Sequence, residues 1–542
     1  MAHEPLQRGR LAGALPTVAD LVFIGMASLV VSAAALPVLT GDGDLASHIR
    51  MGELILAGGT IPEAYPFTYA MEGSRFLGHA WLGEVVLAAT HSAGGLAAVL
   101  VLAGVLIGLC FAMLCRFLVA RGVGVYAALA ATGLAAGGSV LHWLGRSHLF
   151  TWYFALLLLI LLENPRARAW WLAPLFVLWT NLHGGFTYGI LLVGLYLLAA
   201  AIDALVTGRR EGAEPTWRTA LRRARQDATV RRYAGFLGWA IAGSLVNPRG
   251  PLLYLEIATL LGDASIIDRI NEFQSPDFHW GFATPFLLAL LLAYAALALR
   301  RARLPTAWIL VLLANTYYAL YSARNIPLFL LVAFPLMVIF AARGWPALAV
   351  RPARPGGDFL QEKALQGPGW LSFVFALGLS LVAVNEGRLA GAQLLPNGFS
   401  PDRFPVEAVR AARAADLAGP LFNEMVWGGY VAYAWPERRA YIDGLLYDGE
   451  LLEEYRTIAM ARPGWREAIE GRGMRLALVA PGGALAEHLV DEPGWGLRHC
   501  DGTAAVIVLR QGGERGAAAH ERLAGCRQEA DARADSAPRL TE

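Results

Sequence analysis

The sequence predicts a mainly α-helical, polytopic membrane protein with a small α/β domain outside the membrane at its C-terminal end. Hydrophobic residues make up 56% of the 542 residues and charged residues only 16%, and the mean hydropathy is +0.46. Soluble domains average about 45–50% apolar and about 25% charged residues. Long apolar segments recur up to Val384, whereas the later apolar runs are short. We therefore expect the lipid bilayer as a partner and no nucleic acid.

The first apolar stretch is predicted to be an uncleaved transmembrane helix. Arg8 and Arg10 precede a stretch from Val18 to Leu39. That length exceeds the apolar core of a signal peptide and is enough to cross ~30 Å of hydrocarbon. No convincing cleavage site precedes the acidic Gly41-Asp42-Gly43-Asp44 that follows.

Ten further apolar segments bring the expected number of spans to about eleven. They cover approximately Gly94–Leu118, Val123–Leu141, Leu149–Leu162, Trp170–Leu182, Thr187–Leu205, Tyr233–Leu245, Pro285–Leu299, Pro305–Tyr321, Pro327–Ala341 and Trp370–Val384. Several of them are shorter than the roughly 20 residues that span a bilayer, so the count has a margin of about one or two.

The arginines indicate how these spans are oriented. Cytoplasmic loops carry an excess of Lys and Arg, and alternate connections here are rich in arginine. These arginines are Arg116, Arg121, Arg166, Arg168, Arg209, Arg210, Arg218, Arg222, Arg223, Arg225, Arg231, Arg232, Arg300, Arg301, Arg303, Arg343, Arg351 and Arg354. The pattern predicts a cytoplasmic N-terminus and a C-terminal domain on the other side of the membrane.

The opposite connections carry a different set of polar residues, at the external ends of the spans. Ionisable groups at such depths are costly and usually line a site or pair with each other. Alternatively, single Arg and His side chains reach towards the lipid headgroups. Because six separate external junctions share this character, we favour a common site.

The strongest local signal is Asp42 and Asp44 in a glycine-rich context, followed by His48. Two carboxylates separated by one residue can hold a divalent cation, Mg²⁺ or Mn²⁺, or one of them can accept a proton from an attacking hydroxyl. The alternative is structural, because Asp often begins a helix or occupies a solvated turn.

Arginine and amide residues at other external junctions are candidates for binding. Arg146 with His148, and Arg324 with Asn325, suit a lipid phosphate at this depth. A salt bridge from these arginines to Glu84, Glu272 or Asp44 is the alternative. Asn181 and His183 precede Gly184-Gly185, which is typical either of a break between two spans that face one site or of a polar turn.

Residues 391–510 are predicted to form the external α/β domain. Strands are expected at Gly419–Phe422, Arg439–Ile442, Leu476–Val479 and Ala504–Leu509, and helices at Pro405–Ala415 and Glu450–Met460. The tail at 511–542 is either helical or disordered. Cys500 and Cys526 can pair in an oxidising compartment, whereas Cys110 and Cys115 lie in an apolar run and are expected to be buried.

At these residues the chain resembles a known family. Asp42-x-Asp44-x-x-x-His48 after the first span resembles the first external loop of the C-type (GT-C) membrane glycosyltransferases. More closely, the chain is similar to a largely uncharacterised group of bacterial membrane proteins related to them. The pieces that carry this likeness are Ile61-Pro62, Pro66-Phe67-Thr68-Tyr69, His79-Ala80-Trp81-Leu82-Gly83-Glu84, Arg146-Ser147-His148-Leu149-Phe150, Trp179-Thr180-Asn181-Leu182-His183-Gly184-Gly185, Asn247-Pro248-Arg249-Gly250, Glu272-Phe273-Gln274-Ser275-Pro276-Asp277, Ala323-Arg324-Asn325-Ile326-Pro327, Trp427-Gly428-Gly429-Tyr430 and Tyr441-Ile442-Asp443-Gly444. Ser147, Ala64-Tyr65 and Leu445 depart from the group's usual Pro, Asp and Arg.

The resemblance implies a glycosyltransferase of the bacterial inner membrane that acts on the periplasmic face and uses a polyprenyl-phosphate-linked sugar. Residues 1–390 would form a GT-C-like domain with a long first external loop at 40–80. Asp42 or Asp44 would be the general base or hold the metal. The phosphate would be held by Arg146, His148, Arg324 and Asn325, and the acceptor side would be shaped by His48, His79, Glu84, Asn181, His183 and Glu272.

Two other classes stay open. A lipid or polysaccharide carrier, or an assembly factor, can use the same scaffold without chemistry, because a fold does not fix a function. An ion-coupled transporter is the third class, and the near absence of acidic residues from the middle of the spans speaks against it. The sequence indicates no protein partner, sugar or acceptor.

Overall fold

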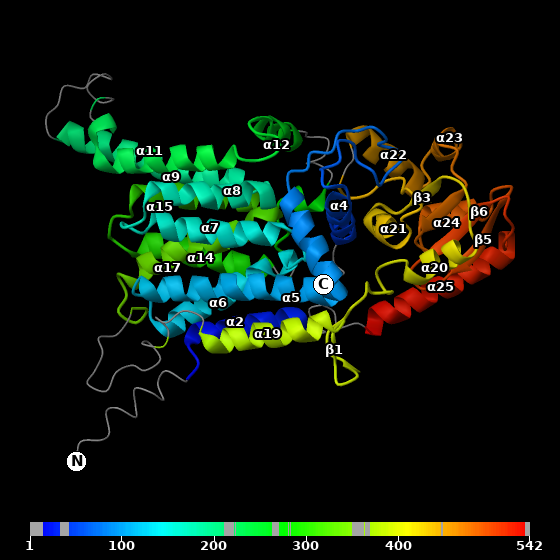
Figure 1. Ribbon diagram of the computed structural model, residues 1–542, viewed down its shortest axis with the longest axis horizontal. Helices are drawn as coiled ribbons and strands as arrows, with labels where there is room; N and C mark the ends of the chain where they lie inside the picture. The colour runs from blue at the N-terminus through cyan, green and yellow to red at the C-terminus, as the bar shows by residue number, and fades with distance from the viewer. Residues whose placement is uncertain are drawn as a thin grey trace, which may run out of the picture.

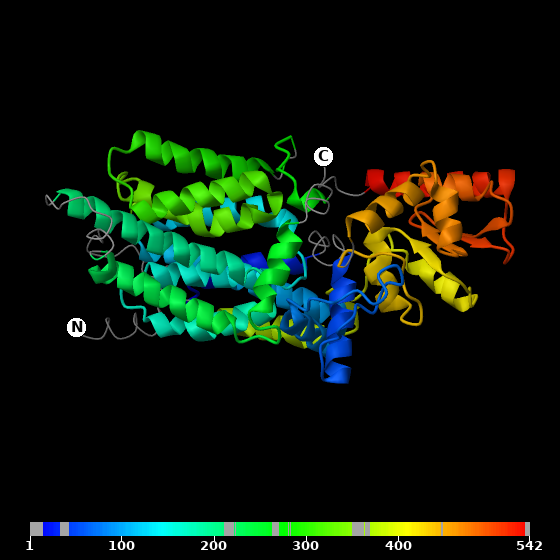
Figure 2. The same ribbon diagram turned by 90° about the horizontal axis from the view of Figure 1, so that it is seen from above.

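A helical bundle and an α/β domain lie side by side in the protein. The computed structural model describes residues 15–32, 43–210, 222, 224–262, 270–279, 281, 283–349, 363, 369–445 and 448–536. Long helices run in a common direction in the bundle, and the C-terminal domain lies beyond one end of them (Figures 1 and 2). We call this end of the bundle the domain-facing end. Helix α4 (Asp44–Gly58) lies there, across the direction of the bundle.

Each predicted apolar segment contains a helix. The bundle consists of α2 (Val18–Val31), α5 (Trp81–Ala120), α6 (Val125–Ser139), α7 (His148–Leu162), α8 (Leu172–Leu182), α9 (Phe186–Arg210), α11 (Ala228–Ser244), α14 (Ala283–Leu299), α15 (Thr306–Tyr321), α16 (Ile326–Leu328), α17 (Phe334–Ala342) and α19 (Trp370–Val384). Short 3₁₀ and π segments extend them at η2 (Val140–His142), η3 (Ala169–Trp171), η5 (Ala323–Asn325) and η6 (Phe329–Ala333). Helix α12 (Leu252–Gly262) and the turn η4 (Asn271–Phe273) lie near the domain-facing end.

In the described part of the chain, four helices are long and apolar enough to cross a bilayer: Trp81–Ala120, Val125–His142, Phe186–Val206 and Ala323–Ala342. Six shorter apolar helices accompany them. The mainly helical fold with a small sheet is thus confirmed, and the chain is a multi-pass membrane protein. The count of eleven spans stays a prediction, because most of the remaining helices are shorter than a bilayer requires.

A buried aspartate joins the first and last helices of the bundle. Asp20 completes a capping box with Thr17 at the start of α2. Its carboxylate also accepts hydrogen bonds from the backbone N–H groups of Gly369, at 2.7 Å, and Ser372, at 3.0 Å. It therefore satisfies the free N–H groups at the beginnings of two helices at once.

Helix α5 breaks where two glycines follow each other. Gly94 and Gly95 have non-helical backbone angles, and a side chain at Gly94 would meet the carbonyl oxygen of Ala383 at 2.4 Å. Asn397 caps the part of α5 that follows, because its Oδ1 accepts from the N–H of Ala97 at 3.0 Å. The short first part of α5 can thus leave the bundle direction and contact α4.

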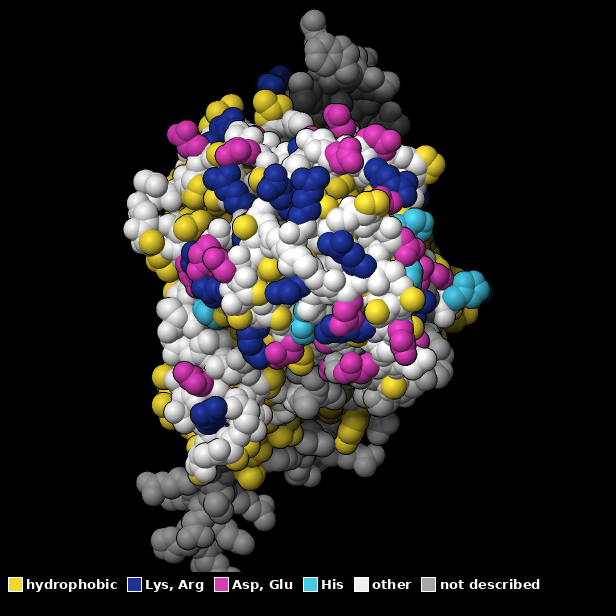
Figure 3. Space-filling view, turned by 90° about the vertical axis from the view of Figure 1, so that its right-hand side faces the viewer, with side chains coloured by type: hydrophobic (Ala, Val, Ile, Leu, Met, Phe, Trp, Pro, Cys, Tyr) yellow, Lys and Arg dark blue, Asp and Glu magenta, His cyan; other side chains and the backbone are white. Residues whose placement is uncertain are grey.

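The C-terminal domain is built on a four-stranded sheet in the order β3-β4-β6-β5. The strands are β3 (Leu421–Asn423), β4 (Leu476–Val479), β5 (Trp495–Cys500) and β6 (Ala505–Leu509), and a hairpin of β1 (Arg388–Leu389) and β2 (Ala392–Gln393) precedes them. The helices are α20 (Val406–Ala414), η7 (Met425–Trp427), α21 (Gly428–Ala434), α22 (Gly449–Ala459), α23 (Trp465–Gly471), α24 (Ala484–Leu489) and α25 (Gly516–Ser536). Charges of both signs cover its outer face (Figure 3), as expected of a domain in water.

Two details of this domain differ from the prediction. The strand expected at Arg439–Ile442 is wrong: this segment bonds to a loop, through Ala440 N–H to the Phe67 carbonyl at 2.9 Å and Tyr69 N–H to the Ala440 carbonyl at 3.0 Å. Strand β5 was not predicted, because a register shift between Leu497 and His499 disrupts its alternation.

Two of the four cysteines form a disulfide, and the other two are free. Cys500 and Cys526 form a disulfide that joins β5 to α25, with their Cα atoms 6.3 Å apart. Cys110 and Cys115 are free and buried in α5. The pairing that the sequence left open is thus made inside the C-terminal domain.

Candidate functional site

The candidate site lies where the domain-facing end of the bundle meets α4 and the C-terminal domain. Asp44 is the first residue of α4, and the helix cap is Gly43, which makes no side-chain capping bond. The carboxylate of Asp44 contacts the guanidinium of Arg146, with Oδ2 and Nη2 2.8 Å apart. Asp44 thus begins α4 without being its N-cap residue, which is Gly43, and the salt bridge to Arg146 is present. Asp42 lies outside the described residues.

The surroundings of Asp44 oppose a simple ionised state. Burial raises the pKa of Asp44 to about 7, an effect that His48 opposes and the charge of Asp443 adds to. Glu272 also raises this pKa and Arg324 lowers it. A carboxyl group with a pKa close to neutral exchanges protons readily at neutral pH, which is the property a general base needs.

His48 and Glu84 form a second buried pair next to Asp44. His48 Nδ1 lies 3.2 Å from Glu84 Oε1, and the Glu84 residue is only 2% exposed. Burial alone would lower the pKa of His48, but the hydrogen bond to Glu84 and the charge of Asp44 raise it. Within the described residues, Glu84 Oε2 is buried without a hydrogen-bond partner.

Two uncharged imidazoles face each other beyond this pair. The rings of His79 and His183 have centroids 6.5 Å apart. His183 Nδ1 accepts a hydrogen bond from the N–H of Gly185 at 3.0 Å and contacts Thr151 Oγ1 at 2.8 Å, so its proton resides on Nε2. Burial lowers the pKa of His183 and brings that of His79 to about 4. Both rings are thus neutral at pH 7.

The second arginine of the site, Arg324, is exposed on η5. Its guanidinium lies over the ring of Phe273, 5.2 Å from the centroid, and it makes no ion pair within the described residues. Burial alone would raise the pKa of Glu272, but Arg146 and Arg324 hold it below its usual value. Ser322 Oγ donates to the Glu272 carbonyl at 3.0 Å, which ties these two segments together.

Three of the predicted site residues bind the protein's own backbone. His148 Nε2 contacts the His142 carbonyl at 2.8 Å, and Asn325 donates to the Tyr318 carbonyl at 3.2 Å. The amide nitrogen of Asn181 donates to two carbonyls, and its oxygen accepts from Trp81 Nε1 at 2.8 Å. Asn181 lies in the last turn of α8, so these contacts join helix ends and loops around the site.

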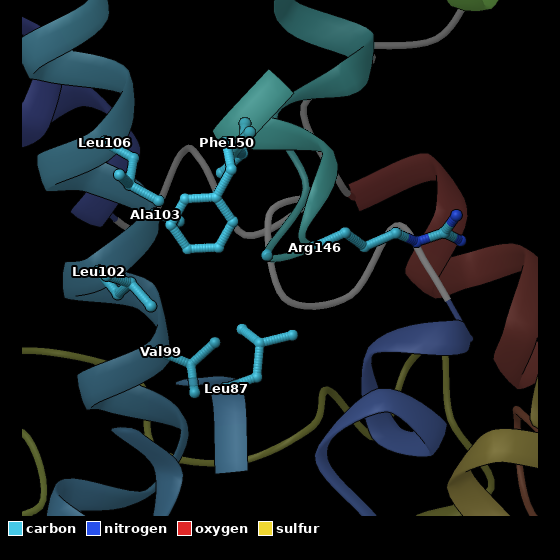
Figure 4. Close-up of a pocket in the computed structure, with 9 residues that line it drawn as sticks. Leu87, Val99, Leu102, Ala103, Leu106, Arg146 and Phe150 are labelled. Carbon is cyan, nitrogen blue, oxygen red and sulfur yellow. The ribbon is translucent and has the colours of Figure 1, made fainter. Parts of the chain in front are cut away.

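A small apolar hollow of about 10 Å³, room for roughly one water-sized molecule, lies between α5 and the start of α7. Its lining is aliphatic and aromatic apart from Arg146. The lining residues are Leu87, Val99, Leu102, Ala103, Leu106, Gly145, Arg146, Leu149 and Phe150. The side chain of Arg146 extends away from the apolar side chains (Figure 4), towards its contact with Asp44. Apolar side chains of α5 and α7 therefore lie next to a cation at the domain-facing end of the bundle.

The structure adds a residue that was not among the predicted site residues. Asp443, from the C-terminal domain, is fully buried and accepts hydrogen bonds from Tyr65 and from Ser47. The sequence signal was its place in Tyr441-Ile442-Asp443-Gly444, a segment that carries the family resemblance. A single Asp after an apolar run gives no indication that it lies beside Asp44, which is 399 positions earlier in the chain.

The described residues do not fit a divalent cation. No group of three or more His, Cys, Asp and Glu side chains among them is arranged to hold a metal ion. Asp44 is also engaged by a guanidinium, which competes with a cation for the same oxygens. The metal site expected at Asp42 and Asp44 therefore stays a prediction, and we derive no step through it.

Together, these features define a multi-pass membrane protein in which acidic, histidine and arginine side chains meet at the end of a helical bundle that adjoins an α/β domain. No family model and no curated protein matches the sequence. The apo structure of the oligosaccharyltransferase of Archaeoglobus fulgidus is similar, with 11% identity and a TM-score of 0.50, over 89% of this chain and 70% of that one. A structure of the same organism's oligosaccharyltransferase AglB, in complex with an inhibitory peptide and a dolichol-phosphate, has 11% identity and a TM-score of 0.49, over 85% of this chain and 69% of that one. The protein thus shares its overall fold with an archaeal oligosaccharyltransferase.

Proposed function

We propose that the protein is an integral-membrane glycosyltransferase that moves a sugar from a polyprenyl-phosphate donor to an acceptor hydroxyl. The fold shared with an oligosaccharyltransferase supports the general class, although a shared fold does not fix the reaction. The single observation that carries the proposal is a continuous arrangement of three parts. The apolar hollow adjoins Arg146, and Arg146 contacts Asp44.

Each part of this arrangement matches one part of the proposed donor and reaction. The polyprenyl chain would lie along the apolar side chains of α5 and α7 that surround this hollow. Arg146 and Arg324 bind the phosphate, because a guanidinium pairs with phosphate oxygens through several N–H donors. Asp44 takes the proton from the acceptor hydroxyl, and its pKa of about 7 suits that role.

The salt bridge between Arg146 and Asp44 supports the following order of donor binding and reaction. Without donor, Arg146 is paired with Asp44. The donor phosphate competes for the same guanidinium, and its binding releases the carboxylate to act as a base. The acceptor oxygen then attacks the anomeric carbon as its proton passes to Asp44. The bond between that carbon and the phosphate oxygen breaks with inversion, and the arginines stabilise the charge that grows on the departing phosphate.

The neutral imidazoles and the charged pair would shape the acceptor side. His183 presents an Nε2–H donor at pH 7, because its Nδ1 is occupied by the Gly185 N–H. His48 and Glu84 form a pair close to Asp44. We assign to these side chains the binding of acceptor hydroxyl groups, which need both donors and acceptors.

We place the site on the periplasmic side of a bacterial inner membrane. The disulfide between Cys500 and Cys526 supports this orientation, since disulfides persist in oxidising compartments. The predicted excess of arginine in the loops at the opposite end agrees with it.

A binding experiment tests the donor class. The purified protein is titrated with a polyprenyl phosphate and with the polyprenol of the same length, and the bound lipid is counted by native mass spectrometry. We expect the phosphate to bind at least about tenfold more tightly, and Arg146→Gln to remove most of that difference. Leu102→Trp, which fills the hollow, should weaken both lipids. Arg166→Gln, an exposed arginine at the opposite end, is the matched control and should change neither.

A turnover experiment separates an enzyme from a carrier. The protein is incubated with lipid-linked sugars extracted from bacterial membranes, and release of polyprenyl phosphate is followed by mass spectrometry. Asp44→Asn should lower release by about 10²–10⁴-fold without weakening lipid binding, because the carboxylate that competes for Arg146 is removed. Equal binding of the phosphate and the alcohol would overturn the donor assignment. Tight binding of the phosphate without release by the wild type would favour the carrier, a class that the Asp44–Arg146 salt bridge also fits.

A further inference from the structure

The C-terminal domain packs against the start of α4 at Gly43, Val426 and Gly429, where the glycines allow the two backbones to touch. We call this contact the glycine seam. A side chain at Gly43 would lie 2.0 Å from the Val426 carbonyl oxygen, and one at Gly429 would lie 2.3 Å from the Gly43 carbonyl oxygen. Within the domain, a side chain at Gly428 would lie 2.1 Å from the Ile442 carbonyl oxygen. Real Cβ atoms do not approach other atoms so closely, so only glycine fits at these positions.

This seam brings the end of the Tyr441–Gly444 segment onto Asp44. A Cβ atom at Gly444 would lie 1.9 Å from Asp44 Oδ1 and 2.8 Å from its carboxyl carbon. The backbone of the C-terminal domain is thus in van der Waals contact with the carboxyl group that we propose as the general base. The other charged groups that act on Asp44 are His48, Glu272, Arg324 and the directly contacting Arg146.

Asp443 holds this contact in place. Its carboxylate accepts hydrogen bonds from the hydroxyl of Tyr65 and, at 3.2 Å, from Ser47 Oγ, while the N–H of Leu445 donates to it at 3.1 Å. Tyr65 and Ser47 belong to the region between the first helix and α5, and Ser47 lies on α4 itself. A buried carboxylate with donors from both partners costs much to remove, because the donors would be left without acceptors.

We infer that the C-terminal domain forms one wall of the active site, with Asp443 as a positioning residue and Gly444 as the wall against Asp44. The term active site here rests on the proposed function, but the contact itself does not depend on it. The domain is therefore a part of the site, and not only a cover or an acceptor-binding module next to it. If the domain moved away, the Asp44 side chain would lose its contact with Gly444 and could rotate away from Arg146.

A rescue experiment tests the wall without any substrate. Thermal unfolding of the full-length protein in detergent is measured for Gly444→Ala, Asp44→Ala and the double variant. We expect Gly444→Ala to lower the unfolding midpoint by a few degrees, because the new methyl group collides with the Asp44 carboxylate. Asp44→Ala removes the colliding group, so Gly444→Ala should cost little in that background. Gly471→Ala, a glycine of the same domain with open space around it, is the matched control.

The positioning residue is tested by a second cycle. Tyr65→Phe and Asp443→Asn each weaken the same hydrogen bond, so the loss in midpoint for the double variant should be smaller than the sum of the single losses. If Gly444→Ala lowered the unfolding midpoint as much in the Asp44→Ala background as in the wild type, the proposed packing of Gly444 against Asp44 would be overturned. Additive losses for Tyr65→Phe and Asp443→Asn would overturn the positioning role, and so would an Asp443→Asn variant in which the effect of Asp44→Asn on the pH dependence of stability is the same as in the wild type. Because neither cycle uses lipid or turnover, their failure is distinct from failure of the proposed transferase activity.

Discussion

The two ends of the bundle each hold a carboxylate against an arginine, and they do so in different ways. At the domain-facing end Asp44 contacts Arg146 at 2.8 Å. At the other end of α7, Glu163 contacts Arg121 at 3.1 Å. The two ion pairs have similar distances, but the hydrogen-bond donors and the charges around the two carboxylates differ.

Glu163 is surrounded by donors alone. Its Oε1 accepts from the hydroxyl of Tyr196 at 2.7 Å and from Trp308 Nε1 at 2.8 Å, and Arg121 binds Oε2. These contacts join α7, α9, α15 and the end of α5. A buried carboxylate whose lone pairs all meet donors is a rigid structural tie.

Asp44, by contrast, lies among groups that compete with each other. Asp443 and Glu272 raise its pKa by repulsion, and Glu84 nearby keeps one oxygen buried without a partner among the described residues. Such an arrangement costs stability and persists where function requires it. The difference agrees with the proposed function, which assigns the chemistry to the domain-facing end.

Removal of the structural carboxylate should have the largest effect. Glu163→Ala leaves Arg121, Tyr196 and Trp308 without their acceptor, and we expect a loss of about 3–5 kcal/mol in the free energy of unfolding. Unfolding in mixed detergent and SDS micelles measures it. Glu386→Ala, an exposed residue, should cost nothing measurable. A loss for Glu163→Ala no greater than that for Asp44→Ala would contradict the comparison.

Removal of a single donor should have a smaller effect. Trp308→Phe deletes the Nε1–H that Glu163 accepts but keeps an aromatic ring beneath Arg343, which lies 5.0 Å from the Trp308 ring centroid. We expect a loss of about 1.5–3 kcal/mol, the usual range for a hydrogen bond to a charged group. Trp239→Phe, on the exposed side of α11, is the control in the same unfolding assay.

The pH dependence of stability should distinguish the two ends. The pKa of Asp44 is raised from 3.8 to about 7 in the folded protein, so between these values the folded state holds a proton that the unfolded state has released. Asp44 therefore contributes stability that grows as the pH falls from about 7 towards 4, and the raised pKa of His48 contributes with the same sign. The lowered pKa values of His79 and His183 contribute with the opposite sign below about pH 6.5, so the prediction concerns the difference between two proteins. Asp44→Asn should lose the Asp44 contribution, and its stability should respond less favourably to acid than that of the wild type. An unchanged slope in Asp44→Asn would refute this origin.

Much of the bundle follows from the sequence, because apolar length and arginine distribution depend on local composition alone. The helices α7, α15 and α19 begin and end within a residue or two of the predicted segments. Asp44, Arg146 and Arg324 can also be recognised as candidate site residues from the sequence, because an ionisable residue at the end of an apolar span stands out without any knowledge of the structure.

The remaining features depend on distant parts of the chain. Asp443 is buried only because the glycine seam brings its segment onto α4, and no local pattern encodes that approach. Asn181 and Asn325 bind backbone carbonyls whose positions follow from helix packing. The hydrogen bonds of segment 439–442 go to a loop near residue 68, so a strand-like sequence forms no strand there.

The smallest effect is expected for an exchange of carboxylate for amide at Glu84, and it gives the sharpest contrast between the ends. Glu84→Gln loses the ionic part of the contact with His48, but it also removes a buried charge with an unpartnered oxygen. Since these contributions have opposite signs, the change in unfolding free energy should stay within about 1 kcal/mol. Glu163→Gln is the matched exchange, and it should cost more, because its new NH₂ group would face Arg121 or the Tyr196 and Trp308 donors. Equal costs for the two amides, measured in the same micelles, would mean that the domain-facing end is as well satisfied as the other and would remove the electrostatic argument for a reactive site there.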